Sequence, residues 1–352
     1  MKPAVLNGIS SLRAISCLLI AVYHITENLV ANGRGEWFPF PQTPGIHLFL
    51  VISGFVLAYT ARADDTPVRF ILRRLARVVP LYWLLTALTI MLASWHSWLF
   101  PGADLSFSSI VSSFLFLPQR DLLGAIQPIL FVGWTLNYIV LTYIMVAMAT
   151  VAPARMRPFI AIGLLVAFMT LARLLPEVPM RAFWSDWIQL EFIVGLAAGA
   201  LMHDSRVAAW IGRHSMWPIT AVGGIGLVAG SLSDLGGLPR ILVCGLSSAV
   251  VVFSLAGQDI YRKALVDGLL PWVGRISYSI YLVHPLIVPL VGLAVIGHLG
   301  SHEAEVAVDI VVSLGLTIAA AYVCYRFVES PIYAWVRDRT KTPQREVAFP
   351  PA

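Results

Sequence analysis

Apolar stretches long enough to cross a lipid bilayer alternate with short polar connections along almost the whole chain. A transmembrane helix needs about 20 predominantly apolar residues. Stretches of this kind lie at approximately 9–31, 45–61, 78–98, 128–152, 157–176, 187–203, 215–232, 238–256, 276–298 and 305–327. The pattern predicts an all-α polytopic membrane protein with about ten transmembrane helices.

The composition agrees with that pattern. Of the 352 residues, 58% are hydrophobic and only 12% are charged, and the mean hydropathy is +0.80. A soluble globular domain needs far more polar surface than this. We expect residues 1–336 to form a single transmembrane domain. Residues 337–352 are basic and contain proline, and we expect them to form a disordered cytoplasmic tail.

The positive charges indicate the orientation. If the N-terminus is cytoplasmic and the stretches alternate in direction, eighteen of the 24 lysines and arginines fall inside and five outside, with Arg13 in the membrane. This is the distribution that the positive-inside rule favours. We therefore expect a multi-pass protein of a bacterial inner membrane with both termini in the cytoplasm. Because the basic residues are spread over many loops, a nucleic-acid partner is not expected.

Neither a leader sequence nor a cysteine framework is indicated. Lys2 is the sole charge ahead of the first stretch and no small-residue cleavage site follows it, so we expect an uncleaved helix. Cys17, Cys244 and Cys324 lie far apart in apolar stretches. Neither a disulfide framework nor a cysteine metal site is expected from that spacing.

The first apolar stretch contains two polar residues, Arg13 and His24. Eleven residues separate them, which is close to three helical turns, so they share one face at levels about 16 Å apart. An arginine near the centre of an isolated membrane helix costs roughly 2.5–3.5 kcal/mol, so this face is expected to line protein or water. The alternative is an interfacial anchor for Arg13 and a packed core position for His24.

A group of arginines enters the third stretch. Arg69, Arg73 and Arg77 are four residues apart and share a helical face, and Arg74 lies beside them. Two interpretations remain open. The cluster sets the topology by attraction to anionic lipid, or its guanidinium groups bind the phosphates of a donor such as acyl-CoA.

Polar residues in the second half point to an interior site. Glu191 lies in an apolar stretch, where a carboxylate is expected to be paired or to face a cavity. Gly195 and Gly199 follow it with the spacing of a helix-packing face. Tyr278 and His284 lie on one side of the predicted ninth helix, with Tyr281 midway between them.

The ordered set of motifs resembles the acyltransferase 3 family of integral-membrane acyltransferases, in particular those that acetylate bacterial exopolysaccharides. The matching segments are LRAISCLLIAVYH (12–24), SGF (53–55), RFILRRLARVVPLYW (69–83), GWTLNY (133–138), EFIVG (191–195), GRISYSIYLVHP (274–285) and FVESP (327–331). The resemblance implies transfer of an acyl group, with acetyl expected, from cytoplasmic acyl-CoA to a hydroxyl of an exopolysaccharide or a lipid-linked sugar. Acyl-CoA would be a co-substrate, and no tightly bound cofactor or metal is expected.

The resemblance also assigns residues. His24 matches the essential histidine of the family, Arg13 its first-helix arginine, and Arg74 with Arg77 its basic motif near the donor. We expect His24, Arg13 and Glu191 to be catalytic and the arginine cluster, Arg69 and Arg73 included, to bind the donor. The residues expected to shape the site or the substrate path are Ser53, Trp134, Asn137, Tyr278 and His284.

Two positions depart from the family pattern. The family has an acidic residue where this chain has His47, and a glutamate where it has Ile139. Carboxylates of this kind orient a catalytic histidine, so we expect either a slow enzyme, which Ile139→Glu would accelerate, or substitution by Glu27 or Glu191. The alternatives to an active enzyme are a non-catalytic family member and a transporter for a small anion or a lipid-linked sugar.

Overall fold

The computed structural model describes residues 6–34, 43–62, 64–176, 179–262, 267–299 and 301–340. Every regular element in these ranges is helical. The main helices are α1 (Asn7–Ala31), α2 (Pro44–Tyr59), α3 (Pro67–Trp95), α4 (Phe107–Phe114), α5 (Trp134–Ala149), α6 (Arg157–Ala172), α7 (Pro179–Trp184), α8 (Gln189–Leu201), α9 (Ser205–Arg213), α10 (Trp217–Leu232), α11 (Gly237–Arg262), α12 (Leu269–Arg275), α13 (Ser277–Val295), α14 (His302–Cys324) and α15 (Ser330–Arg339).

The helices confirm an all-α protein with several membrane-length segments. Seven helical segments in the described ranges are long and apolar enough to cross a membrane, and the bent pair Met180–Leu201 and Ser205–Arg213 would make an eighth. Each of the ten predicted stretches coincides with a helix, but α2 and α10 have only 16 residues. The number of crossings and the orientation of the termini therefore remain predictions.

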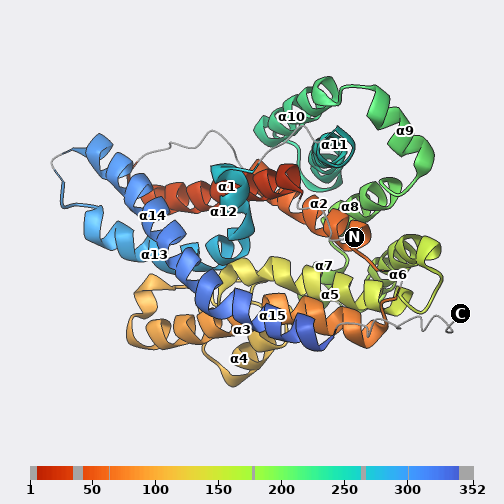
Figure 1. The fold of residues 1–352 in the computed structure, drawn as a ribbon. Helices are drawn as coiled ribbons and strands as arrows, with labels where there is room; N and C mark the ends of the chain where they lie inside the picture. The colour runs from red at the N-terminus through yellow and green to blue at the C-terminus, as the bar shows by residue number, and fades with distance from the viewer. Residues whose placement is uncertain are drawn as a thin grey trace, which may run out of the picture.

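Helix α1 is central to the arrangement, with α10 and α11 on one side of it and α3 and α5 on the other in the view of Figure 1. It contacts α2, α11, α12, α13 and α14. At Gly274 of α12 a Cβ atom would collide with the carbonyl oxygen of Ser10, so only glycine permits this approach. Arg13 and His24 of α1 are consequently partly enclosed by other helices.

Helices α2 and α8 are in unusually close contact. A Cβ atom at Gly54 would collide with the carbonyl oxygen of Phe192, and one at Gly195 with that of Val51. The packing face predicted from Gly195 and Gly199 is confirmed. Because the two backbones touch, the side chains at the ends of these helices are held at fixed separation.

Two helices extend beyond the predicted membrane stretches. Helix α3 begins at Pro67, ahead of the apolar stretch at 78–98, because Thr66 caps its first turn and Pro67 occupies a position that needs no N–H donor. Helix α15 continues to Arg339, into the segment predicted to be disordered, while residues 341–352 lie outside the described residues. The helical arrangement predicted for Arg69, Arg73 and Arg77 is confirmed, because all three lie within α3.

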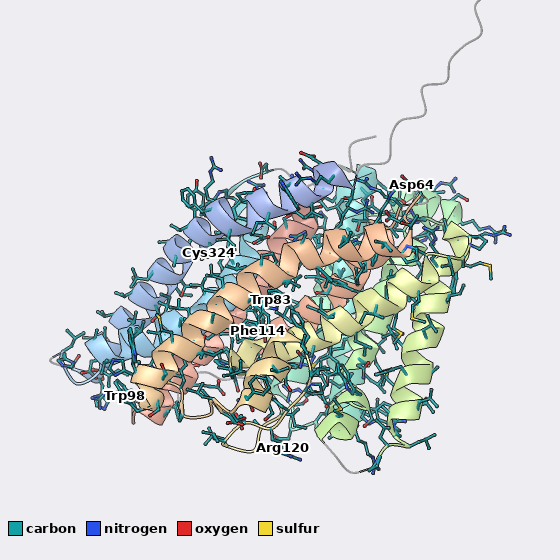
Figure 2. The ribbon with its side chains drawn as sticks, turned by 90° about the horizontal axis from the view of Figure 1, so that it is seen from below. Asp64, Trp83, Trp98, Phe114, Arg120 and Cys324 are labelled. Atoms are coloured by element: carbon teal, nitrogen blue, oxygen red, sulfur yellow. The ribbon has the colours of Figure 1, made fainter. Side chains whose placement is uncertain are left out.

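Helix α3 runs alongside the C-terminal segment that carries Cys324 (Figure 2). A π-helical turn, Tyr325–Glu329, joins α14 to α15 and makes one continuous helical segment. On its other side, α3 holds α4 through two side chains: the Tyr82 hydroxyl donates to the Ser113 carbonyl and Trp83 Nε1 donates to that of Phe114. These contacts fix the helix that presents the arginines.

Candidate active site

Three of the cavities lined by described residues lie between the helices around α1. The largest, of about 520 Å³, is lined by His24, His47, Trp134, Tyr138 and Asp186 among others, and is called the histidine cavity here. The other two, of about 70 and 200 Å³, share Arg13 and Arg77 and are called the arginine cavities. The face of α1 predicted to line an interior therefore contributes His24 to one site and Arg13 to the others.

His24 carries a carboxylate partner within its own helix. Its Nδ1 lies 2.8 Å from Glu27 Oε2, at a spacing of three residues. An ionised carboxylate only accepts hydrogen bonds, so Nδ1 carries a proton, and in the neutral imidazole Nε2 then keeps its lone pair. Since the ring lines the histidine cavity, this tautomer gives the cavity a basic nitrogen.

His284 supports the ring of His24. The two rings stack with centroids 5.3 Å apart and an interplanar angle of 18°. His284 Nδ1 donates to the Ile280 carbonyl at 3.2 Å, whereas its Nε2 is buried without a hydrogen-bond partner. The Phe131 ring meets the His24 ring edge-on, with the two ring centroids 4.9 Å apart. These contacts and Glu27 restrict how the His24 ring can turn.

A second histidine–carboxylate pair links α2 to α8. His47 Nδ1 lies 2.5 Å from Glu191 Oε1, and both side chains are almost fully buried, at 1% and 0% exposure. Glu191 was expected to be paired, and His47 is its partner. His47 is also the position at which the family has an acidic residue. Glu191 does not line the histidine cavity, so any effect it has on chemistry must act through His47.

The arginine cavities gather cationic side chains from three helices. Arg13, Arg74 and Arg77 line the smaller one together with Ser53 and Tyr278. Ser53 Oγ donates to the Phe49 carbonyl at 2.8 Å, so its hydroxyl is engaged as a structural donor. The Tyr278 hydroxyl likewise donates to the Val78 carbonyl, at 2.5 Å.

The larger arginine cavity adds a residue that the sequence did not single out, Arg275 of α12. Its acidic member is Glu329, which accepts a hydrogen bond from Ser279 Oγ at 2.9 Å and lies 3.8 Å from Arg77 Nε. With Arg13 also in the lining, guanidinium groups outnumber carboxylates there. The cavity is therefore suited to an anionic group.

The predicted arginine cluster separates into two parts. Arg74 and Arg77 face the arginine cavities, whereas Arg69 and Arg73 line neither of them. Arg73 instead forms an ion pair with the buried Asp65. Arg74 and Arg77 are therefore the members of the cluster that one helical turn presents to this space, and donor binding by any of the four stays a prediction.

Two further predicted residues lie elsewhere than expected. Ile139 lines the smaller arginine cavity, away from the lining that contains His24, so a carboxylate at this position would meet arginines first. Asn137 is buried with both amide atoms unpartnered and lines none of the three cavities. Trp134 does line the histidine cavity.

Comparison with known proteins gives two kinds of match. The family profile described as an acyltransferase domain matches residues 6–326. The exopolysaccharide production protein ExoZ of Rhizobium meliloti (strain 1021) is 32% identical over 258 residues, which cover 71% of this chain and 78% of that protein. The acyltransferase MdmB of Streptomyces mycarofaciens is 24% identical over 373 residues. These residues cover 94% of this chain and 93% of the length of MdmB.

Proposed function

The chain belongs to the acyltransferase 3 family of membrane acyltransferases, and from this premise we propose that it moves an acyl group from acyl-CoA to a sugar hydroxyl. Acetyl is the proposed acyl group. The proposed acceptor is an exopolysaccharide or a lipid-linked sugar, and the similarity to an exopolysaccharide production protein supports this choice. Because the family consists of acyltransferases, a transporter for a small anion or a lipid-linked sugar is no longer the favoured alternative.

The observation that carries the proposal is the His24–Glu27 pair in the histidine cavity. An Nε2 lone pair on a ring held by a carboxylate and by His284 is suited to removing a proton from a hydroxyl. General base catalysis of this kind contributes typically about 10²–10⁴-fold in rate. The cavity volume of about 520 Å³ suits a ligand of small-molecule size.

The arginine cavities support acyl-CoA as the donor. Guanidinium groups bind phosphate oxygens bidentately, and acyl-CoA carries a pyrophosphate and a further phosphate. Arg13, Arg77 and Arg275 would hold these groups, with Arg74 beside them. Arg13 and His24 are about 16 Å apart along α1, a gap that the extended arm of the donor would have to cross. We propose that the donor side is cytoplasmic.

The proposed reaction balances without a cofactor. His24 Nε2 takes the hydroxyl proton as the oxygen attacks the thioester carbonyl, the carbon–sulfur bond breaks, and the proton ends on the CoA thiol. A route in which the acyl group first forms a bond to His24 and then passes to the sugar uses the same residues.

Transfer of labelled acetyl groups tests the proposal directly. Purified protein given labelled acetyl-CoA and extracted exopolysaccharide should label the glycan, and His24→Ala should lower the rate at least about 100-fold. His203, an exposed residue stacked on Tyr59, provides the control variant His203→Ala, which should retain activity. Labelling that survives His24→Ala would remove His24 from the chemistry, and no labelling by the wild type would refute the donor or the acceptor.

A further inference from the structure

A second set of side chains lines the histidine cavity besides the histidines: Trp134, Tyr138 and Asp186. Tyr138 is fixed in place because its ring stacks on Phe183 with centroids 4.0 Å apart, and its hydroxyl donates to the Phe183 carbonyl at 2.8 Å. The Trp134 ring meets the Tyr138 ring edge-on, with the two ring centroids 6.1 Å apart. The cavity thus has a rigid aromatic wall.

Asp186 is oriented by the backbone that follows it. Its Oδ1 accepts a hydrogen bond from the Ile188 N–H at 2.8 Å, at the turn that leads into α8. Its other oxygen, Oδ2, has no hydrogen-bond partner among the described residues, and the side chain is exposed. A carboxylate that is held at one oxygen and open at the other can accept hydrogen bonds from ligand hydroxyls.

The charge of this lining is unfavourable for an anionic ligand. Among the described residues that line the histidine cavity there is no lysine or arginine, and Asp186 is the acid. Arg240 of α11 is buried with Nε and Nη2 unpartnered, but it does not line the cavity, and its charge acts on Tyr23 and Glu191. A carboxylate on the ligand would therefore meet Asp186 without a cation in the lining to balance it.

We propose that Trp134, Tyr138 and Asp186 form the acceptor subsite and that this subsite selects an uncharged pyranose. The hydroxyls of the sugar donate to Asp186 Oδ2, and its apolar C–H face packs on the aromatic wall. The hydroxyl to be acylated then points at His24. This inference rests on the proposed function and adds the class of sugar and a residue that determines specificity.

The proposed preference for an uncharged sugar can be tested on the wild-type protein with two matched sugars and no acyl donor. Methyl glucoside and methyl glucuronoside differ in one carboxylate, and their binding to purified protein is measured by titration calorimetry. The neutral glycoside should bind at least about tenfold more tightly, since like charges in a partly buried site repel. Equal or tighter binding of the glucuronoside would overturn the proposal and point to Arg240 as an anion site.

Asp186→Asn tests the role of the Asp186 charge. The asparagine oxygen can still accept the hydrogen bond from the Ile188 N–H, but the negative charge is lost. We expect the KM of the sugar acceptor to rise about 10- to 100-fold, the range for a hydrogen bond to a charged group. The KM of acetyl-CoA should stay the same, and the preference for neutral over uronate acceptors should fall. Asp204→Asn is the matched control, since Asp204 caps α9 through the same contact to the N–H two residues on.

The outcomes separate this inference from the proposed function. An unchanged acceptor KM in Asp186→Asn, or a parallel change in both KM values, would assign Asp186 a structural role only. Should that variant fail to fold, the two glycosides still decide the selection on the wild type. Absence of acetyl transfer by a wild type that binds the neutral sugar would refute the donor and leave the sugar subsite intact.

Discussion

His24 and His47 both hold a carboxylate on Nδ1, yet they differ in access. The His24 side chain is 22% exposed and its partner Glu27 52%, whereas His47 and Glu191 are exposed by 1% and 0%. The first pair lies within one helix, and the second joins residues 144 positions apart. Both rings line the histidine cavity, but the first pair is partly exposed, whereas His47 Nε2 is buried and Glu191 lies outside the lining.

The difference assigns the pairs to different tasks. A base must reach its substrate, which His24 can do through the histidine cavity. A buried pair contributes little net stability by itself, but removal of one partner leaves the other charge unpaired and is strongly destabilising. His47 and Glu191 thus hold α2 against α8, beside the glycine contacts of those helices, and keep the wall of the cavity in place.

The largest expected effect is on stability. His47→Ala leaves the Glu191 carboxylate buried without its partner and should reduce the free energy of unfolding by about 3–5 kcal/mol. Thermal unfolding in detergent measures this, with His203→Ala as the control at an exposed histidine. The double variant His47→Leu/Glu191→Leu should recover much of the loss, because it removes both charges. Equal melting temperatures for His47→Ala and His203→Ala would show that the buried pair does not stabilise the fold.

A smaller effect, on rate alone, is expected at the exposed pair. Glu27→Gln keeps an oxygen that can accept from His24 Nδ1 but removes the negative charge that favours this tautomer. We expect kcat to fall about 10- to 100-fold, the range for a hydrogen bond to a charged group, with the melting temperature almost unchanged because the side chain is half exposed. A drop in melting temperature as large as that of His47→Ala would show that both pairs are structural.

The smallest effect concerns Ile139, where the family has a glutamate. Because Ile139 lines the smaller arginine cavity, Ile139→Glu should pair with those arginines and compete with donor phosphates. We now expect a rise of a few-fold in the KM of acetyl-CoA and no gain in kcat, with Ile139→Gln as the uncharged control. A clear gain in kcat would restore the view that this position tunes His24.

Much of the fold and part of the site follow from the sequence. Apolar length predicts helices because backbone groups in lipid must bond within their own segment. The spacing of Arg13 and His24 predicts their common face, because helical periodicity is fixed. The family resemblance, which the profile match over residues 6–326 confirms, gives the enzyme class, which spacing alone could not.

The rest of the site depends on contacts between distant parts of the chain. Glu191 needed a partner, but nothing in its own segment indicates His47 of another helix. In the arginine cluster, a step of one residue turns a side chain by about 100°, so small uncertainty in phase exchanges Arg73 for Arg74. Asp186 lies in a short break between apolar helices, and only the fold brings it to the same cavity as Trp134.

The central claim is that His24 is the base and His47 is not. The direct test is acetyl transfer per folded molecule in His24→Asn and His47→Asn, measured beside each other with labelled acetyl-CoA and extracted exopolysaccharide. Asparagine at 47 keeps an N–H donor for Glu191, so that variant should retain activity within about tenfold of wild type, whereas His24→Asn should lose at least about 100-fold. Retained transfer in His24→Asn together with loss in His47→Asn would contradict the account.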